Sequence, residues 1–252
     1  MKYIVGDIGN TLTKISLLDS KFKIKKSYNI ETKKLYSKKN QSLFLKKFAK
    51  KSFNKKFLFS SVVPDVFRII KLYFKKKNFK TIEIKELKIK KIIDLNIDNA
   101  SQLGSDRIAN AIGAQEKSKK DCLIIDFGTA TTFDIVSKNG KYNGGVIAPG
   151  IKSSIVNLNE STASLPFFKL KIKAKCYGKN TKDALNAGFL WGYQGLINNI
   201  VKKITSSSKK KYKIILTGGY ANLFKKYLIK KPLIDQNITI KGIIKIYKEL
   251  LI

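Results

Sequence analysis

The residues with the clearest capacity for chemistry form two similar short motifs. One copy surrounds Asp7 in residues 4–11, and the other surrounds Asp126 in residues 124–131. Each copy is an apolar run, an aspartate, an apolar residue, a glycine and then small polar residues. Glycine lets backbone N–H groups approach an oxyanion closely, and an aspartate at a strand end can hold a hydrated divalent cation. The repeat therefore predicts two hairpins that bind the β- and γ-phosphates of ATP.

Composition restricts the other chemistry that the chain can perform. It contains no histidine and only two cysteines, Cys122 and Cys176. The absence of histidine excludes Ser-His-Asp and Cys-His nucleophilic arrangements, and two cysteines are too few for a thiolate zinc cage. General acid–base chemistry therefore falls to carboxylates, lysines or tyrosines.

The net charge of +35 suggests nucleic-acid binding, but the distribution of cations argues against a specific site. Arg68 and Arg107 are the only arginines, so lysine supplies the other 50 cations, whereas readers of base edges usually use the arginine fork. Lysine is also missing from the segments that hold most of the glycine, aspartate and threonine clusters. We interpret the lysines as a solvated surface, and we expect nucleic-acid binding not to be specific.

Hydropathy predicts a cytosolic protein without a membrane span. No run reaches the roughly 18 apolar residues that a membrane helix needs, and Asp7 interrupts the N-terminal apolar run before a signal peptide could form. The cysteines are accordingly expected to be free thiols.

The pattern of apolar runs and turn residues predicts alternating strands and helices, and so the α/β class. The predicted strands are 2–6, 12–18, 22–30, 57–63, 82–84, 122–127, 131–137, 142–147 and 214–217. The predicted helices are 43–48, a segment after Pro64, 103–114, 150–159, 181–204, 221–229 and 241–252.

The duplicated motif predicts two similar halves, since a long-period repeat of one hairpin indicates a repeated domain. We place the boundary in the polar, lysine-rich segment 116–120, which gives domains 1–116 and 117–252. The closing helix 241–252 either stays with the second domain or packs back on the first. An active site in a cleft between the two domains is expected.

Seven motifs together resemble the type III pantothenate kinases, a branch of the superfamily of acetate and sugar kinases, heat-shock-70 proteins and actin. The first is Asp7-Ile8-Gly9-Asn10-Thr11-Leu12-Thr13-Lys14, which matches the opening motif of that family. The others, in order, are Gly104-Ser105-Asp106-Arg107, Asp126-Phe127-Gly128-Thr129-Ala130-Thr131-Thr132, Gly144–Gly150, Thr162–Pro166, Asn180-Thr181 and Thr217-Gly218-Gly219. They cover almost the whole chain.

The resemblance implies two actin-like, ribonuclease H-like domains, each a mixed sheet flanked by helices. It also implies that ATP phosphorylates the 4′-hydroxyl of pantothenate, the first step towards coenzyme A, in a homodimer that needs Mg²⁺ and K⁺ or NH₄⁺. Asp106 would be the general base, Asp7 would organise Mg²⁺ through water, and Asp126 would help hold the monovalent cation. Residues 7–14 would bind ATP phosphates, and Thr129 would contact ATP. Pantothenate would contact Gly104, Ser105, Asp106, Arg107 and Thr181.

Departures from the family pattern leave two other functions open. The family commonly has Tyr and Pro where this chain has Ile97 and Ala100, and Asp where it has Tyr220. The first alternative is a kinase of the same fold that acts on another small alcohol. The second is a non-catalytic accessory factor that binds nucleotide or nucleic acid, although the three acids at 7, 106 and 126 favour catalysis.

Overall fold

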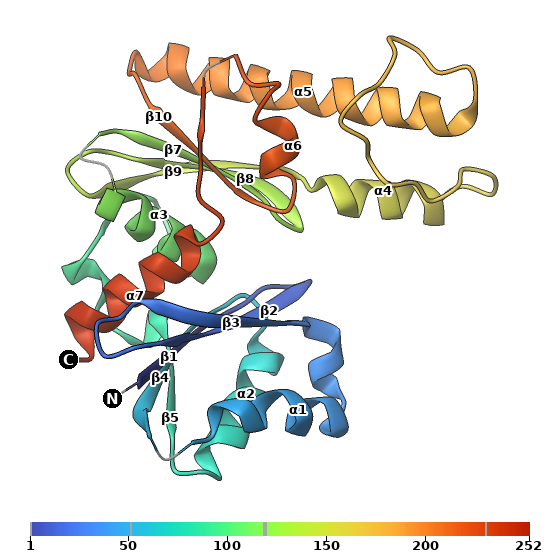
Figure 1. Ribbon diagram of the computed structural model, residues 1–252. Coiled ribbons are helices and arrows are strands. Elements are labelled where there is room, and N and C mark those ends of the chain that lie inside the picture. The colour runs from blue at the N-terminus through green and yellow to red at the C-terminus, as the bar shows by residue number, and fades with distance from the viewer. Residues whose placement is uncertain (1, 51, 118–119, 230) are drawn as a thin grey trace. The chain divides into compact units, whose positions relative to one another are not determined.

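The computed structural model describes residues 2–50, 52–117, 120–229 and 231–252 (Figure 1). It contains two mixed sheets with helices, which confirms the predicted α/β class. Two parts of the predicted 116–120 boundary segment, residues 118 and 119, lie outside the described residues. The chain divides into two compact units. The first is Met1–Lys119, Asn139–Tyr142 and Asn237–Ile252, and the second is Lys120–Lys138 and Asn143–Gln236.

The first sheet has the strand order β3-β2-β1-β4-β5. Strand β1 pairs antiparallel with β2 and parallel with β4, and β4 pairs parallel with β5. The strands are β1 (Lys2–Ile8), β2 (Leu12–Leu18), β3 (Ile24–Glu31), β4 (Phe53–Ser61) and β5 (Lys80–Glu83).

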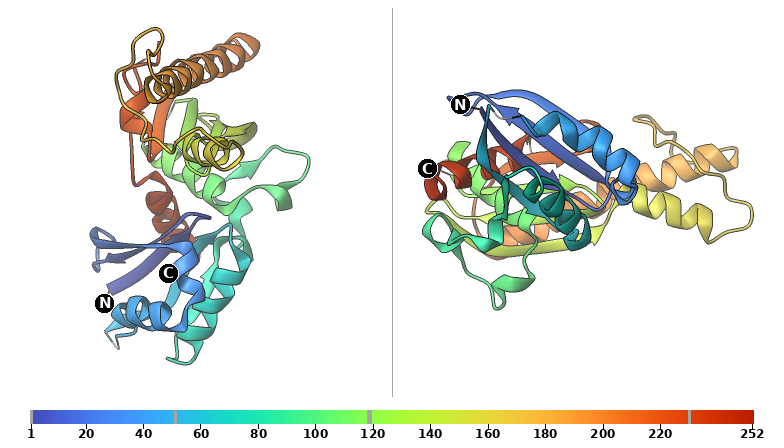
Figure 2. Two further views of the ribbon diagram at one scale, coloured as in Figure 1. Left: turned by 90° about the vertical axis from the view of Figure 1, so that its right-hand side faces the viewer. Right: turned by 90° about the horizontal axis from the view of Figure 1, so that it is seen from below.

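Helices of the first unit cover this sheet. Helices α1 and α2 lie together on one side of it, and their apolar faces join the core cluster that includes Ile4, Phe57 and Phe74 (Figure 2). The helices and short 3₁₀ turns are η1 (Thr32–Tyr36), α1 (Lys38–Leu45), η2 (Lys46–Phe48), α2 (Pro64–Lys75), η3 (Ile84–Glu86), η4 (Ile89–Lys91), η5 (Ala100–Gln102), α3 (Ser105–Lys117) and α7 (Ile238–Leu250).

Helices α3 and α7 cross at two glycines. A Cβ atom on Gly113 would come 2.2 Å from the Ile238 carbonyl oxygen, and one on Gly242 would come 1.8 Å from the Ala109 carbonyl oxygen. Thr239 also donates a 2.7 Å hydrogen bond to the buried Asn110 amide oxygen. The C-terminal helix therefore packs against α3, and α7 begins at Ile238, three residues before the start predicted from the sequence.

The second sheet has the order β11-β10-β7-β8-β9-β6. Within it, β7 pairs antiparallel with β8 and parallel with β10, as β1 does with β2 and β4. The strands are β6 (Asp94–Leu95), β7 (Cys122–Phe127), β8 (Ala130–Val136), β9 (Lys141–Pro149), β10 (Lys213–Gly218) and β11 (Leu233–Ile234). Strand β6 pairs with residues 141 and 142 at the start of β9.

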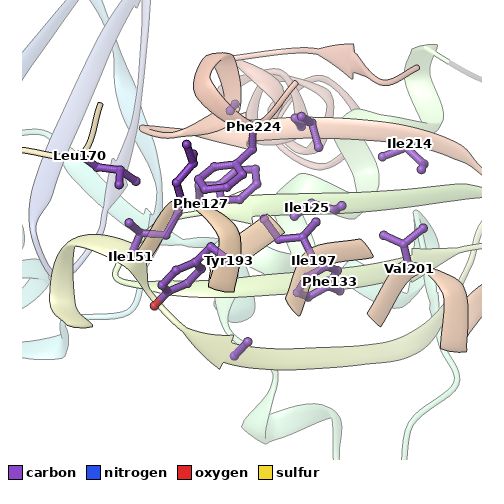
Figure 3. Packing of buried hydrophobic residues seen from close by; sticks show 14 of the residues in the cluster. Ile125, Phe127, Phe133, Ile151, Leu170, Tyr193, Ile197, Val201, Ile214 and Phe224 are labelled. Atoms are coloured by element: carbon purple, nitrogen blue, oxygen red, sulfur yellow. The ribbon is translucent and has the colours of Figure 1, made fainter. Parts of the chain in front are cut away.

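The core of the second unit lies between its sheet and its helices. Phe127 of β7 stacks on Phe224 with ring centroids 5.5 Å apart, and Tyr193 and Ile197 of α5 pack on the same cluster (Figure 3). The helices are α4 (Ile151–Glu160), α5 (Thr181–Ser208) and α6 (Ala221–Phe224). Helix α6 is shorter than the helix 221–229 that hydropathy predicts. Among the described residues, no helix combines the length and the apolar character needed to cross a membrane.

Candidate active site

The first phosphate hairpin joins β1 to β2. Asp7 lies opposite Lys14 in the antiparallel pair and beside Ser60 in the parallel pair. The Gly9 N–H donates to the Leu12 carbonyl over 3.1 Å and closes the turn, whose tip residues Asn10 and Thr11 are exposed. The hairpin thus places a carboxylate and an ammonium directly below an exposed glycine turn, which suits the binding of a phosphate with its divalent cation.

Thr32, on the 3₁₀ turn η1, supports this hairpin. Its hydroxyl donates to the Gly9 carbonyl over 2.6 Å, and its backbone N–H donates to the Thr11 carbonyl over 3.0 Å. The same hydroxyl oxygen lies 3.0 Å from that of Thr13, and the side chains of Thr13 and Ile8 are fully buried. Of the predicted phosphate-binding stretch 7–14, these two residues therefore stabilise the hairpin from within. The sequence carries no signal for Thr32, which is distant along the chain.

Lys14 is held by a residue that sequence analysis also missed. Its ammonium group donates a 3.0 Å hydrogen bond to the Asn237 side-chain oxygen, just before α7 begins. Burial lowers the pKa of Lys14, and the nearby negative charge of Asp7 partly opposes that shift. A partly desolvated, oriented ammonium interacts strongly with a phosphate because little water screens it.

The second chemical cluster of the first unit is the N-terminal turn of α3. Ser105 is buried, and the Arg107 N–H donates to the Asp106 carboxylate over 2.8 Å. A Cβ atom on Gly104 would lie 2.5 Å from the same carboxylate oxygen, so a side chain there would displace the Asp106 carboxylate. The Arg107 guanidinium lies 6.0 Å from the centre of the buried Tyr142 ring.

Burial raises the pKa of Asp106 above the ordinary aspartate value. Contacts from the Arg107 N–H and the charges of Arg107 and Lys85 oppose this shift without reversing it. A carboxylate with a raised pKa accepts a proton more readily, which is the property required of a general base near neutral pH.

In the second unit, the β7–β8 hairpin repeats the first with a difference in register. Asp126 lies opposite Thr132 and beside Thr217 of β10. The Gly128 N–H donates to the Ala130 carbonyl over 3.1 Å, so the turn is one residue shorter than the first. Thr129 is exposed at its tip, and its carbonyl accepts a 2.9 Å hydrogen bond from the Ser153 hydroxyl in the first turn of α4.

The turn after β10 brings backbone close to Asp126. Gly218 has φ +84°, and a Cβ atom there would lie 2.6 Å from an Asp126 carboxylate oxygen. The Gly219 N–H donates to the Phe127 carbonyl over 3.0 Å, and the Gln236 side chain donates to the Gly218 carbonyl over 3.0 Å. Only glycine fits this approach, which leaves the Gly218 backbone against the Asp126 carboxylate.

Thr181 lies at the rim of an apolar cavity of about 630 Å³ between α4 and α5, which run side by side in Figures 1 and 2. Asn180 caps α5 by accepting the Asp183 N–H over 2.9 Å. The residues that shape the cavity include Pro149, Leu158, Thr181, Phe189, Tyr193 and Leu196.

The donor atoms fit a hydrated divalent cation better than an enclosed metal cage. Within the described ranges, no group of three or more histidine, cysteine, aspartate or glutamate residues could hold an ion. Mg²⁺ usually keeps several waters and is bound by one or two carboxylates plus substrate phosphates. A single strand-end carboxylate such as Asp7 is consistent with that mode of binding.

The structure therefore assigns the predicted site residues to two groups. Asp7, Lys14, Asp106 and Arg107 belong to the first unit, and their elements β1, β2 and α3 lie within it. Asp126, Thr129 and Thr181 belong to the second unit.

Comparison with known proteins identifies the family. Residues 3–203 match the family model described as type III pantothenate kinase. A type III pantothenate kinase of Pelagibacter ubique is 47% identical over 244 residues, which cover 96% of this chain and 97% of that protein. One from Sulfurihydrogenibium is 36% identical over 246 residues, covering 94% and 96%.

Solved structures show the same fold at lower identity. A Campylobacter jejuni protein named for the Baf family of transcriptional activators is 22% identical, has a TM-score of 0.62 and covers 98% of each chain. A Sinorhizobium meliloti protein named as a 2-dehydro-3-deoxygalactonokinase is 9% identical, has a TM-score of 0.61 and also covers 98% of each chain. These likenesses confirm the predicted fold of two mixed sheets flanked by helices.

ATP with a divalent metal is the phosphoryl donor in this family, and pantothenate is the acceptor. The family match thus favours pantothenate over the two alternatives left open by the sequence, another small alcohol or a non-catalytic accessory factor. The chain belongs to the type III pantothenate kinase family and catalyses the ATP-dependent phosphorylation of pantothenate in coenzyme A biosynthesis.

Proposed function

We propose that Asp106 is the general base that removes the proton from the pantothenate hydroxyl. The observation that carries this proposal is its environment: burial raises the pKa of Asp106, while the Arg107 N–H holds one carboxylate oxygen at 2.8 Å. The base is thus oriented and keeps a raised affinity for the proton. Positioning and charge neutralisation supply most of the rate enhancement in phosphoryl transfer, so a carboxylate suffices.

The remaining chemical groups take complementary roles. Asp7 would contact Mg²⁺ through water, and the backbone of the turn at Gly9, Asn10 and Thr11 would bind ATP phosphates with the Lys14 ammonium. Their support is the exposed turn and the Asp7–Lys14 pairing. Leu12, Thr13 and Ile8 belong to this hairpin, and the burial of the last two gives them a supporting part.

On the acceptor side, the turn Gly104-Ser105 and the Arg107 guanidinium would bind pantothenate beside Asp106. The planar guanidinium can donate two parallel N–H hydrogen bonds to a carboxylate, which the lysine ammonium cannot do in a fixed plane. Arg107 is one of two arginines in a chain of 50 lysines, and its position over the Tyr142 ring supports a fixed orientation.

For the second unit we propose a monovalent cation site and an ATP contact. The Asp126 carboxylate lies against the Gly218 backbone, and its oxygens would bind K⁺ or NH₄⁺. Thr129, exposed at the hairpin tip, would contact ATP.

A homodimer is proposed from the apolar cavity between α4 and α5. Phe189 and Leu196 line it together with Thr181, and three glycines of α5 have no neighbouring atoms within 4 Å of an added Cβ. A smooth apolar face of this kind can pack against a second copy, which would bring Thr181 to the partner's pantothenate. Cytosolic location and the absence of specific nucleic-acid binding stay predictions.

The test measures ADP release by the wild-type protein and by Asp106→Asn, with and without pantothenate, in K⁺ or Na⁺. We expect pantothenate to stimulate ADP release, and we expect the rate in K⁺ to exceed the rate in Na⁺. Asp106→Asn should lower kcat by about 10²–10⁴-fold. Full activity in the Asn variant would exclude Asp106 as the base, and equal rates in K⁺ and Na⁺ would exclude the cation site.

A further inference from the structure

A second carboxylate lies next to the catalytic turn of α3 but belongs to none of the seven sequence motifs. Glu83 is the last residue of β5 and is partly buried. One of its carboxylate oxygens accepts the Ser61 N–H over 3.3 Å, and the other accepts the Lys85 N–H over 2.6 Å. Both oxygens are thus held by backbone donors from different segments.

These contacts connect Glu83 to the end of the strand beside Asp7. Ser61 ends β4 and lies in register with Ile8, the residue after Asp7. The next residue, Val62, donates its N–H to the Ile8 carbonyl over 3.0 Å. Glu83 therefore fixes the strand end that neighbours the first phosphate hairpin.

The same carboxylate lies beside the residue that precedes Asp106. The hydroxyl of Ser105 is 1% exposed and makes no hydrogen bond of ordinary geometry with the described residues, but it is near enough to Glu83 to favour the ionised carboxylate. Burial raises the pKa of Glu83, whereas Ser105, the two backbone donors and the charge of Lys85 oppose the shift. The charge of Lys85 also acts on Asp106, and its ammonium is fixed by a 3.1 Å hydrogen bond to the Ser101 carbonyl.

We propose that Glu83 is a positioning residue for phosphoryl transfer, which holds the first turn of α3, and with it Asp106, against the end of β4. This inference rests on the proposed role of Asp106 as general base. Glu83 touches no reacting atom in this assignment and acts through the Ser61 strand end. The next residue of that segment, Val62, has a side-chain carbon 3.6 Å from the position that a Cβ would take on Gly104, directly before α3. An error of about 1 Å in the position of a catalytic group can cost on the order of 10²-fold in rate, so such support has a measurable effect.

The hydrogen-bond pattern explains why a carboxylate is required at this position. Both Glu83 oxygens face N–H donors, and glutamine would present its own NH₂ group to one of them. Glu83→Gln therefore keeps the size of the side chain and loses at least one contact. Glu83→Asp keeps both acceptors but shortens the side chain by one methylene.

Glu86 provides a matched control three residues further on. It is exposed and pairs with the Lys71 ammonium over 2.9 Å, away from Ser105 and Ser61. We expect Glu83→Gln to lower kcat about 10-fold while KM for ATP changes by less than about twofold. Glu86→Gln should leave both constants within about twofold of wild type, and Glu83→Asp should recover part of the lost kcat.

A double-mutant cycle with Asp106→Asn separates positioning from a general structural effect. If Glu83 acts through Asp106, Glu83→Gln should lower kcat about 10-fold in the wild-type background and less than about twofold in the Asp106→Asn background. An equal loss in both backgrounds, or wild-type kcat in Glu83→Gln, overturns the inference.

Two further outcomes keep the interpretation unambiguous. If Asp106→Asn retains full activity, the proposed base is wrong, and this result does not depend on Glu83. If Glu83→Gln fails to fold, as judged by its melting temperature, the same cycle is run with Glu83→Asp. Wild-type kcat in that variant, or an equal loss in both backgrounds, then overturns the inference.

Discussion

The two units share one arrangement of strands but differ in what lies opposite the aspartate. In the first sheet the order is β3-β2-β1-β4-β5, and the second sheet has the corresponding order β9-β8-β7-β10-β11 with β6 added at one edge. Asp7 and Asp126 are the next-to-last residues of the corresponding strands β1 and β7. Yet Asp7 faces Lys14, whereas Asp126 faces Thr132.

A one-residue difference in turn length accounts for this divergence. The first turn closes from Gly9 to Leu12, and the second closes from Gly128 to Ala130. Because side chains alternate along a strand, a shift of one residue in pairing changes which residue lies opposite each aspartate. The same scaffold thus yields one hairpin in which an ammonium group faces the aspartate and one in which a neutral hydroxyl group faces it.

Helix packing around the two sheets differs as well, and glycine substitutions test this difference most strongly. Gly242→Ala would place a Cβ 1.8 Å from the Ala109 carbonyl and separate α7 from α3. We expect the free energy of unfolding to fall by about 3 kcal/mol, the upper end of the cost of overpacking. Chemical denaturation measures this value, and kcat should fall with it because α3 carries Asp106.

The matched substitution in the second unit is Gly188→Ala. No atom lies within 4 Å of a Cβ at this position of α5, so the monomer can accept the methyl group. Alanine favours a helix over glycine by about 0.5–1 kcal/mol, so a small gain in the stability of the monomer is expected, measured at a protein concentration low enough to keep the proposed α5 dimer face unpaired. Equal losses of unfolding free energy in Gly242→Ala and Gly188→Ala would show that α7 and α5 are packed equally tightly, which would contradict the difference between the two units.

Replacing the residue opposite each aspartate tests whether the two hairpins contribute differently to ATP binding. Lys14→Met removes the ammonium that faces Asp7 but keeps most of the side-chain stem. We expect KM for ATP to rise about 10-fold, equivalent to about 1.4 kcal/mol, because a charged contact to phosphate is lost. Thr132→Val in the second hairpin should change KM for ATP by less than about twofold. Steady-state kinetics at saturating pantothenate distinguish the two.

The strand sequence and the two hairpins could be predicted because they depend on local patterns. Apolar runs ended by aspartate and glycine predict β1, β2, β7 and β8 to within a residue at most ends, and the family motifs indicate Asp106 and Arg107. Turn length, however, is decided by backbone hydrogen bonds that the repeat in sequence does not reveal. Aligning the two motifs residue by residue matches Lys14 with Phe133, although Thr132 is the residue opposite Asp126.

Long-range supports of the site could not be predicted for a different reason. Thr32, Glu83 and Asn237 are ordinary polar residues in segments without a motif, and each acts through a contact that folding creates. The crossing of α3 and α7 likewise depends on Gly113 and Gly242. On helix propensity alone, glycine is a weak helix former, so the sequence does not indicate this packing role. Predicting such contacts requires knowing which strands and helices pack against one another.

The smallest effect that we predict concerns the energetic cost of the buried base, a feature of the first unit. Because the folded-state pKa of Asp106 is raised by burial, folding is favoured when this carboxyl is protonated and disfavoured when it is ionised. Asp106→Asn removes that cost, and its amide oxygen can still accept the Arg107 N–H. We expect the melting temperature at pH 8 to rise by a few degrees, corresponding to about 1 kcal/mol.

The pH dependence of the gain in melting temperature shows whether it comes from the Asp106 carboxyl. As the pH falls through the raised pKa of Asp106, the wild-type carboxyl becomes neutral, so the difference between wild type and Asp106→Asn should shrink. Calorimetry at pH 8 and at pH 4 measures both differences. A gain that is the same at the two values would mean that ionisation of Asp106 does not strain the folded protein.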